Sequence, residues 1–199
     1  QKAIIVADDN TWRVAGADAQ RSLDEAGIVS YPAFVFPSED FYAEWKHIET
    51  LKAHLEPLDA IAIAVGSGVI NDTVKYVSFL LGRKYMCVGT AASMDGFTAY
   101  GSSITKDGNK QTFDCPAPFG FVLDSAIAAE APKELAASGY ADLIAKIPAA
   151  ADWMIADAVG SEKIDDFAWG LVQDGLKEAL ADPAAVHAGD VEKTQALAD

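Results

Sequence analysis

The sequence predicts an α/β protein in which a domain built on a parallel sheet is followed by an all-helical domain that is incomplete. Short apolar runs alternate with longer amphipathic stretches over the first part of the chain, a pattern typical of successive βαβ units. Beyond Pro132 the sequence is acidic, rich in alanine and helical in its periodicity. We therefore expect the sheet domain at residues 1–131 and the start of the helical domain at residues 132–199.

Three strands are expected in the first part of the sheet domain, at residues 2–7, 31–36 and 59–65. A helix capped by Asp9 or Asn10 would connect the first two strands, and a helix capped by Ser38 would connect the next two. The third strand is an almost unbroken apolar run. Such a run is typical of a central strand that is covered on both faces.

The second part of the sheet domain contains a long irregular insertion. A helix would follow the third strand and stop at Gly82, and further strands are expected at 85–88 and 119–123. Between the two strands, a turn at Lys106-Asp107-Gly108-Asn109 would close a hairpin that pairs residues 102–105 with 110–113. A loop of this length inside a compact domain is usually functional.

Composition excludes several classes of partner. The formal net charge of -15 argues against nucleic acids and anionic membranes, because proteins that bind these carry basic surfaces. No apolar run approaches the roughly 20 residues of a membrane span, and the first residues lack the features of a signal peptide. We expect a cytoplasmic protein with no nucleic-acid or membrane partner.

The cysteines and histidines do not form a recognisable motif. Cys87 and Cys115 have no CxxC spacing, so buried or unreactive thiols are the simplest interpretation. His47, His54 and His187 are scattered, and no two of them would share a helix face as metal ligands. By themselves the histidines cannot build a metal site.

A Gly-Ser-Gly turn follows the third strand and precedes a helix. Glycines allow a ligand to approach the backbone, and the helix N-terminus offers amides and a positive dipole end to an anion. The dinucleotide fingerprint requires a third small residue where this chain has Asn71, so a diphosphate cradle and a simple tight turn both remain open. Asp72 would repel a phosphate unless it caps amides or meets a ribose or a nicotinamide amide.

Two further segments carry candidate polar groups. Thr90 and Ser93 follow the fourth strand, at the sheet edge where open α/β sheets bind ligands, and Asp95 follows in what is either a turn or part of a site. Asp142 and Lys146 share a helix face. They would form either a surface ion pair or a site in which the carboxylate binds a divalent cation, and spacing does not decide between these.

The segments VGSGVINDTVKYVSF, GTAASMDGF and GYADLIAKIPAAADW, in this order, resemble the sn-glycerol-1-phosphate dehydrogenases, over residues 2–153. These enzymes are a branch of the iron-alcohol-dehydrogenase-like superfamily, with glycerol dehydrogenase and dehydroquinate synthase. The resemblance implies a Rossmann-like NAD(P)-binding domain and a helical domain with a divalent metal, which is zinc, nickel or iron. It also implies reversible hydride transfer between a nicotinamide and dihydroxyacetone phosphate, and a homo-oligomer.

The resemblance also implies roles for individual residues. Asp8, or Asp9, would accept the adenosine ribose hydroxyls, which favours NAD over NADP. Asp95 would face the substrate, Asp142 would be the carboxylate ligand of the metal, and Lys146 would assist electrostatically. The residues that would bind the rest of the cofactor are Gly66, Ser67, Gly68, Val69, Asn71, Asp72, Thr90 and Ser93.

The chain departs from this family in several ways. The two histidine ligands that complete the family's metal site are not matched by His187 or by the earlier histidines, and the family's first strand is not found before Lys2. Ala99 and Pro148 replace a serine and a threonine that are usual there. We therefore expect a chain cut at both ends and inactive as it stands. The alternatives are a glycerol dehydrogenase acting on an unphosphorylated polyol and a nucleotide-binding module without catalysis.

Overall fold

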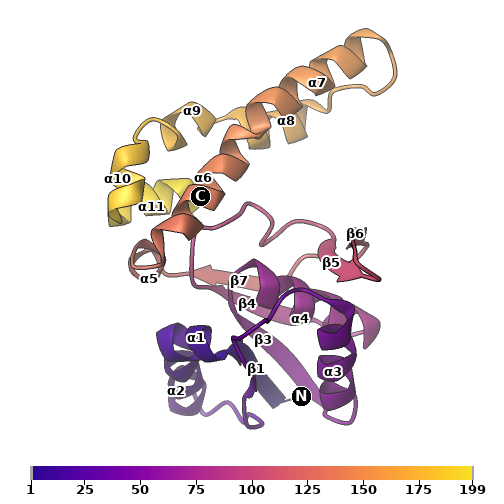
Figure 1. Cartoon of the computed structure of the whole chain (residues 1–199), viewed down its shortest axis with the longest axis vertical. Coiled ribbons are helices and arrows are strands. Elements are labelled where there is room, and N and C mark those ends of the chain that lie inside the picture. The colour runs from indigo at the N-terminus through magenta and orange to yellow at the C-terminus, as the bar shows by residue number, and fades with distance from the viewer. Residues whose placement is uncertain (1, 199) are drawn as a thin grey trace. The chain divides into compact units, whose positions relative to one another are not determined.

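The computed structural model describes residues 2–198, which divide into two compact units (Figure 1). The first unit contains the sheet and consists of the chain up to Ala91 together with Gly96–Ile127. The second unit is helical and consists of the chain from Ala128 onward together with the short segment Ala92–Asp95. The chain therefore leaves the sheet unit after its fourth strand and returns to it four residues later.

The main sheet has five parallel strands in the order β2-β1-β3-β4-β7, which confirms the predicted α/β fold. The strand order reverses direction between β1 and β3, and ligands bind at such switch points in open parallel sheets. The strands are β1 (Lys2–Asp8), β2 (Phe34–Phe36), β3 (Ala60–Gly66), β4 (Tyr85–Gly89) and β7 (Gly120–Leu123).

Helices cover both faces of this sheet (Figure 1). Alternate residues of β1, among them Ile5, pack with Trp12 and Leu23 from the connection to β2, while α3 and α4 contact each other on the opposite face. Almost every side chain of α4 after its first turn is buried until Phe79, which is typical of a central helix. The helical segments are α1 (Asp9–Thr11), the π-helical η1 (Trp12–Gly16), α2 (Ala17–Glu25), α3 (Trp45–Leu55) and α4 (Gly68–Leu80).

A two-stranded antiparallel hairpin lies between β4 and β7 in the sequence, as predicted. It pairs β5 (Ser102–Lys106) with β6 (Asn109–Phe113), one residue longer on each side of the turn than expected. Asp107 and Gly108 both have positive φ, 52° and 76°, the requirement of a type I′ turn. The amide of Thr105 donates to the carbonyl of Ala43 at 2.7 Å, so the hairpin is joined to the segment that precedes α3.

The first helix begins one residue earlier than expected, because Asp8 caps it in place of Asp9 or Asn10. Asp8 Oδ1 accepts hydrogen bonds from the amides of Asn10 and Thr11, both at 2.8 Å. Thr11 Oγ1 accepts a hydrogen bond from the amide of Asp8 at 3.0 Å. This reciprocal arrangement satisfies three amides at the helix start.

Two further expectations about the region before β3 are wrong. Ser38 does not cap a helix: α3 begins at Trp45, after a turn in which Asp40 has a φ of 55°. The second strand covers only Phe34–Phe36 rather than residues 31–36. Pro32 lies in the part of the run that is not a strand, and a proline cannot donate to a strand ladder.

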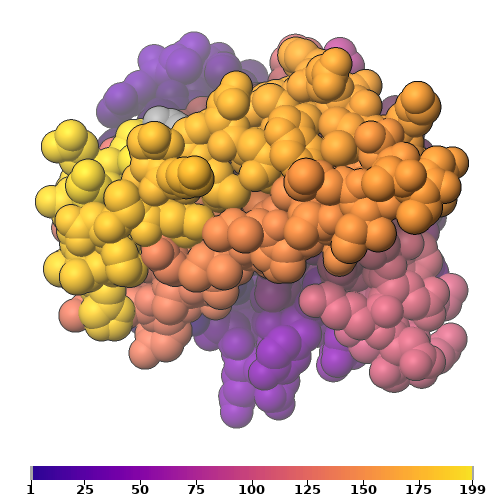
Figure 2. All heavy atoms as spheres, turned by 90° about the horizontal axis from the view of Figure 1, so that it is seen from above, coloured from indigo at the N-terminus to yellow at the C-terminus, as the bar shows by residue number. Residues whose placement is uncertain are grey.

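The second unit is built from short helices around a small apolar core. Ala92, Val186 and Leu197 are buried there, and Tyr140 and Leu143 pack against them. Figure 2 shows the atoms of α9–α11 in yellow at one end of the helical unit and those of α7 and α8 in orange at the other. No helix in residues 2–198 is long and apolar enough to cross a membrane. The helices after β7 are α5 (Ser125–Ala129), α6 (Lys133–Ile144), α7 (Lys146–Ala158), α8 (Asp166–Gln173), α9 (Leu176–Ala179), α10 (Pro183–Ala188) and α11 (Val191–Ala198).

Gly139 allows α6 to approach the segment Ala92–Asp95 closely. A Cβ atom at position 139 would lie 2.1 Å from the carbonyl oxygen of Ala92 and 2.9 Å from its carbonyl carbon. Both contacts are with backbone, so no side-chain rotation relieves them. Any larger residue must move α6 away from the segment.

We predict that Gly139→Ala destabilises the protein by about 2 kcal/mol or more, because the added methyl group overpacks a backbone contact. Gly170→Ala in α8 is the matched control, since its Cβ would meet only Asp174 Oδ2, at 3.6 Å. Replacing a helical glycine where there is room should stabilise by roughly 0.5–1 kcal/mol. Urea unfolding of the two variants measures the difference, and equal effects would show that the close approach is unimportant.

Candidate functional site

The Gly-Ser-Gly turn lies at the switch point of the sheet. Val6 of β1 pairs with Ala64 of β3, so Asp8 and Gly66, two residues further along, end the neighbouring strands at the same level. Helix α4 begins at Gly68, two residues after Gly66, with Ser67 as its N-cap residue. The amides and the positive dipole end of a 13-residue helix are therefore directed to the crevice where doubly wound sheets bind ligands.

Close packing fixes the strand end of this turn. Gly66 is buried, and a Cβ at this position would lie 2.8 Å from both Cβ and Cγ1 of Ile70. The amide of Thr90 donates to the carbonyl of Gly66 at 3.3 Å, which joins the end of β4 to the turn. The next three residues, Ser67, Gly68 and Val69, are half-buried, so they form the accessible part of the turn.

Asn71 is directed into the protein. It is fully buried, and its Oδ1 accepts a hydrogen bond from the Tyr85 hydroxyl at 3.1 Å. Its Nδ2 has no hydrogen-bond partner. Because Asn71 has no exposed surface, it holds α4 from the buried side of the helix. The position at which the dinucleotide fingerprint requires a third small residue is therefore occupied by a buried side-chain amide.

Asp72 is bound to the hairpin. Its Oδ2 accepts a hydrogen bond from the amide of Ser103 in β5, at 3.2 Å. Burial raises the pKa of the Asp72 carboxyl, and the Ser103 amide with the positive charges of Lys75 and Lys110 opposes this shift. A carboxylate at this position would tolerate a nearby phosphate if it bound backbone amides, a ribose or a nicotinamide amide. The structure shows the first of these, the hydrogen bond from the Ser103 amide.

Lys75, one turn further along α4, was not singled out from the sequence. Its side chain is 1% exposed, and Nζ donates to the carbonyls of Gly96 (3.3 Å), Ala99 (3.0 Å) and Gly101 (3.1 Å). The signal in the sequence is a single cation within the mostly apolar helix GVINDTVKYVSFL.

The two acidic residues at the end of β1 have different partners. Asp8 Oδ1 caps the first helix, as described above. Asp9 Oδ2 accepts a hydrogen bond from the amide of Ser38, at 3.1 Å, just beyond the end of β2. Both carboxylates thus lie at the carboxyl ends of strands.

The helical unit brings together three of the predicted residues. The amide of Asp95 donates to Asp142 Oδ2 at 3.2 Å, and the carboxylate of Asp95 forms an ion pair with Lys146. The Asp142–Lys146 pair that spacing suggested is thus replaced by a pair between Lys146 and Asp95. Ser93 lies two residues before Asp95 and is half-buried.

Asp142 and Lys146 lie on two successive helices. Helix α6 ends at Ile144 and α7 begins at Lys146, which places Pro148 in the first turn of α7. The amides of a first helical turn have no intrahelical partner, so a proline there costs no hydrogen bond. This explains how the chain tolerates Pro148.

The residues present do not form a complete metal site. Within residues 2–198 no group of three or more histidine, cysteine, aspartate or glutamate side chains is placed to hold a metal ion. Cys87 and Cys115 are free thiols and buried, as expected, and burial raises the pKa of Cys87 to about 12. A protonated, buried thiol is a poor metal ligand, so neither cysteine would add a ligand to Asp142.

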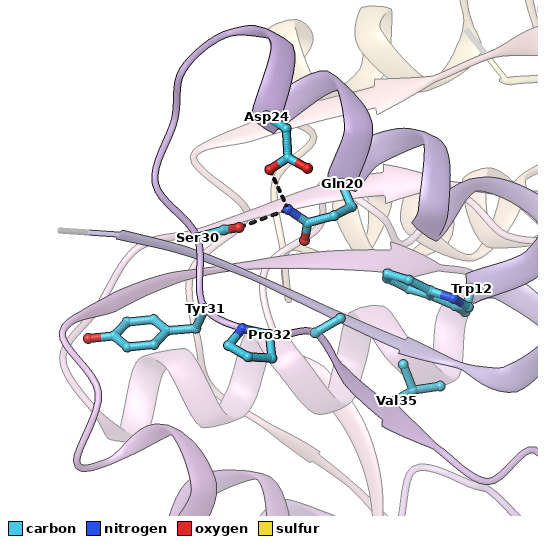
Figure 3. A pocket seen from close by; sticks show the side chains of 8 residues that line it. Trp12, Gln20, Asp24, Ser30, Tyr31, Pro32 and Val35 are labelled. Carbon is cyan, nitrogen blue, oxygen red and sulfur yellow. Dashed lines mark hydrogen bonds between the residues drawn. The ribbon is translucent and has the colours of Figure 1, made fainter.

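A shallow cavity of about 620 Å³ lies elsewhere, beside the edge strand β2 (Figure 3). Gln20 Nε2 donates to Asp24 Oδ1 at 3.0 Å and to Ser30 Oγ at 2.8 Å. These polar groups thus satisfy one another across the cavity wall. The lining residues are Trp12, Gln20, Asp24, Ser30, Tyr31, Pro32, Ala33 and Val35, and none of them is a predicted site residue.

The strand order and the glycine turn at the switch point define the chain as a doubly wound α/β protein of the Rossmann-like class. The chain belongs to the iron-containing alcohol dehydrogenase family, whose sequence model matches residues 1–132. This confirms the family that the three sequence segments indicated.

Curated relatives are similar over most of the chain. The glycerol-1-phosphate dehydrogenase [NAD(P)+] of Bacillus subtilis (strain 168) is 31% identical over 182 residues, which are 90% of this chain and 46% of the relative. The enzyme of the same name from Methanocorpusculum labreanum is 32% identical over 169 residues, which are 84% of this chain and 45% of the relative. The chain thus spans about half the length of the curated relatives that it matches.

Solved structures show the same fold. An iron-containing alcohol dehydrogenase from Thermococcus thioreducens matches with a TM-score of 0.79 and 16% identity, over 100% of this chain and 57% of that one. A probable glycerol dehydrogenase from Sinorhizobium meliloti 1021 matches with a TM-score of 0.75 and 21% identity, over 98% and 56%.

The raised pKa of Asp72 predicts a pH dependence of stability. From the unfolded value near 3.8 up to its raised folded value, the folded state binds more protons than the unfolded state, so stability falls as pH rises through this window. Asp72→Asn keeps an oxygen acceptor for Ser103 and removes the titration. The stability of Asp72→Asn relative to the unsubstituted protein should therefore improve as the pH rises above about 4.

Urea unfolding at a series of pH values measures this difference. Asp107→Asn is the control, because Asp107 is exposed in the hairpin turn and asparagine tolerates its positive φ. If Asp72→Asn and the unsubstituted protein follow parallel pH profiles, burial does not govern this carboxyl.

Proposed function

We propose that this chain is the NAD(P)-binding part of a glycerol-1-phosphate dehydrogenase, which interconverts dihydroxyacetone phosphate and sn-glycerol 1-phosphate by hydride transfer. The observation that carries the proposal is the position of the N-terminus of α4, which follows a glycine turn at the switch point of the sheet. The naming of curated relatives as glycerol-1-phosphate dehydrogenases [NAD(P)+] supports this choice of reaction.

The cofactor would lie across the carboxyl ends of β1, β3 and β4. The backbone from Gly66 through Val69 would bind the pyrophosphate, because Ser67, Gly68 and Val69 are accessible there and lie at the start of a helix. Thr90 and Ser93 would contact the cofactor beyond the pyrophosphate. Bound there, the nicotinamide supplies the hydride chemistry, while the protein binds and orients it.

A carboxylate at the end of β1 would select the cofactor. Asp8 would accept the adenosine ribose hydroxyls with its second oxygen while Oδ1 continues to cap the first helix, and Asp9 is the alternative. A negative charge there would favour NAD over NADP. Asn71 and Asp72 would support the turn indirectly. Their hydrogen bonds with Tyr85 and Ser103 would fix the first turns of α4.

The substrate side of the proposal rests on the helical unit. Asp95 would face the substrate, Lys146 would balance its charge, and Asp142 would be one ligand of a divalent metal such as zinc, nickel or iron. The proposal also includes a cytoplasmic location and a homo-oligomer. Because residues 2–198 hold no complete metal site, a nucleotide-binding module without catalysis is the second candidate for the chain as it stands.

Calorimetric titration with NADH and NADPH tests the proposal. We expect NADH to bind and Asp8→Asn to weaken it by about tenfold or more, because a charged acceptor to the ribose is lost. Asparagine caps helices as well as aspartate, so the thermal stability of Asp8→Asn should stay unchanged. Asp18→Asn, an exposed acid in α2, controls for the change in net charge, and failure of both nucleotides to bind would refute the proposal.

A further inference from the structure

The buried ammonium group of Lys75 has a complete set of hydrogen-bond acceptors. A lysine ammonium has three N–H donors, and three main-chain carbonyls lie at 3.0–3.3 Å from Nζ. A buried charge is strongly unfavourable unless it is hydrogen-bonded. The three carbonyls, from Gly96, Ala99 and Gly101, therefore have to stay where the ammonium can reach them.

These carbonyls belong to one irregular segment, residues 96–101, which continues directly into the hairpin. The amide of Gly101 donates to the carbonyl of Cys115 at 2.8 Å, and the amide of Ser103 donates to Asp72. Asp72 and Lys75 are three residues apart on α4, so both lie on one face of this helix. The segment is also held by Phe97, which is buried and stacks on Phe121 of β7 with ring centroids 5.0 Å apart. Helix α4 is the element that binds three of its carbonyls.

The same segment presents side chains to solvent. Thr98, Ala99 and Tyr100 are exposed, and the Tyr100 side chain is 69% exposed. A fixed backbone with exposed polar and aromatic side chains is the usual construction of a binding loop on a rigid scaffold. Helix α4, which fixes the segment, is also the helix whose N-terminus follows the glycine turn.

We propose that Lys75 is a positioning residue for the nucleotide site, which fixes residues 96–101 so that they form part of the site at the N-terminus of α4. This inference rests on the proposed NAD(P) binding. Without the ammonium the three carbonyls lose their donors, and the segment would sample other conformations. The apparent affinity for NADH would then fall in proportion to the population of the competent conformation.

Lys75→Met tests the proposal, because methionine fills a similar buried volume without the charge. Val74→Ala is the matched control: Val74 is the preceding residue of α4, fully buried, and its truncation lowers stability while leaving the three hydrogen bonds from Lys75 to the segment in place. Hydrogen exchange of the Gly101 and Ser103 amides reports on the segment, and calorimetry reports on NADH. We expect faster exchange at these amides and about tenfold weaker NADH binding in Lys75→Met, and neither change in Val74→Ala.

A measurement on the unsubstituted protein needs no variant to fold. If residues 96–101 form part of the site, saturating NADH should slow exchange at the Gly101 and Ser103 amides. Bound NADH that leaves these amides unchanged, or equal losses of affinity in Lys75→Met and Val74→Ala, would overturn this inference alone. Failure of the unsubstituted protein to bind NADH would overturn the proposed function with it.

Discussion

The desolvated ammonium group of Lys75 is the constraint around which the sheet unit's irregular region is arranged. Burial removes water from all three N–H donors, and the low dielectric of the interior makes both the cost of a missing acceptor and the strength of each bond larger. Regular secondary structure offers few free carbonyls to such a group. An irregular segment offers several, and residues 96–101 provide the three that are needed.

Helix α4 therefore has two separate chemical roles along its length. Its first turn follows a glycine turn and presents the first amides of the helix, which suits an anionic ligand. In the following turns the polar side chains are directed into the protein. Asn71 accepts a hydrogen bond from Tyr85, and Asp72 and Lys75 bind the insertion between β4 and β7. The helix is consequently buried on nearly all sides while it keeps one polar, accessible end.

Local patterns in the sequence predicted most of the fold. The strands of the sheet, the hairpin and the end of α4 just before Gly82 follow from apolar runs and glycine positions that act over a few residues. The cap at Asp8 was missed because several candidate caps lie close together there and side-chain geometry decides among them. The start of α3 was missed because its N-cap residue, Glu44, makes no side-chain capping hydrogen bond, so no capping signal marks this helix in the sequence. Propensity alone does not distinguish Asp8 from Asp9.

The candidate site was predictable to a lesser degree. The glycine turn has a local signature, and it was found. The directions of Asn71 and Asp72 depend on Tyr85 and Ser103, which are distant in the sequence, and the partner of Lys146 is Asp95 rather than its helical neighbour Asp142. Such pairings arise from tertiary packing, so they cannot be predicted from the spacing of residues in the sequence.

One of the points at which the chain passes between its two units is the peptide bond between Asp95 and Gly96, and polar contacts fix the residues on both sides of this bond. Within the helical unit the amide of Asp95 is bound by Asp142 and its carboxylate by Lys146. Within the sheet unit the carbonyl of Gly96 is bound by Lys75. A residue proposed to face the substrate thus adjoins, in the sequence, the segment proposed to complete the nucleotide site. Each of the two residues is thus fixed within its own unit by polar contacts from that unit.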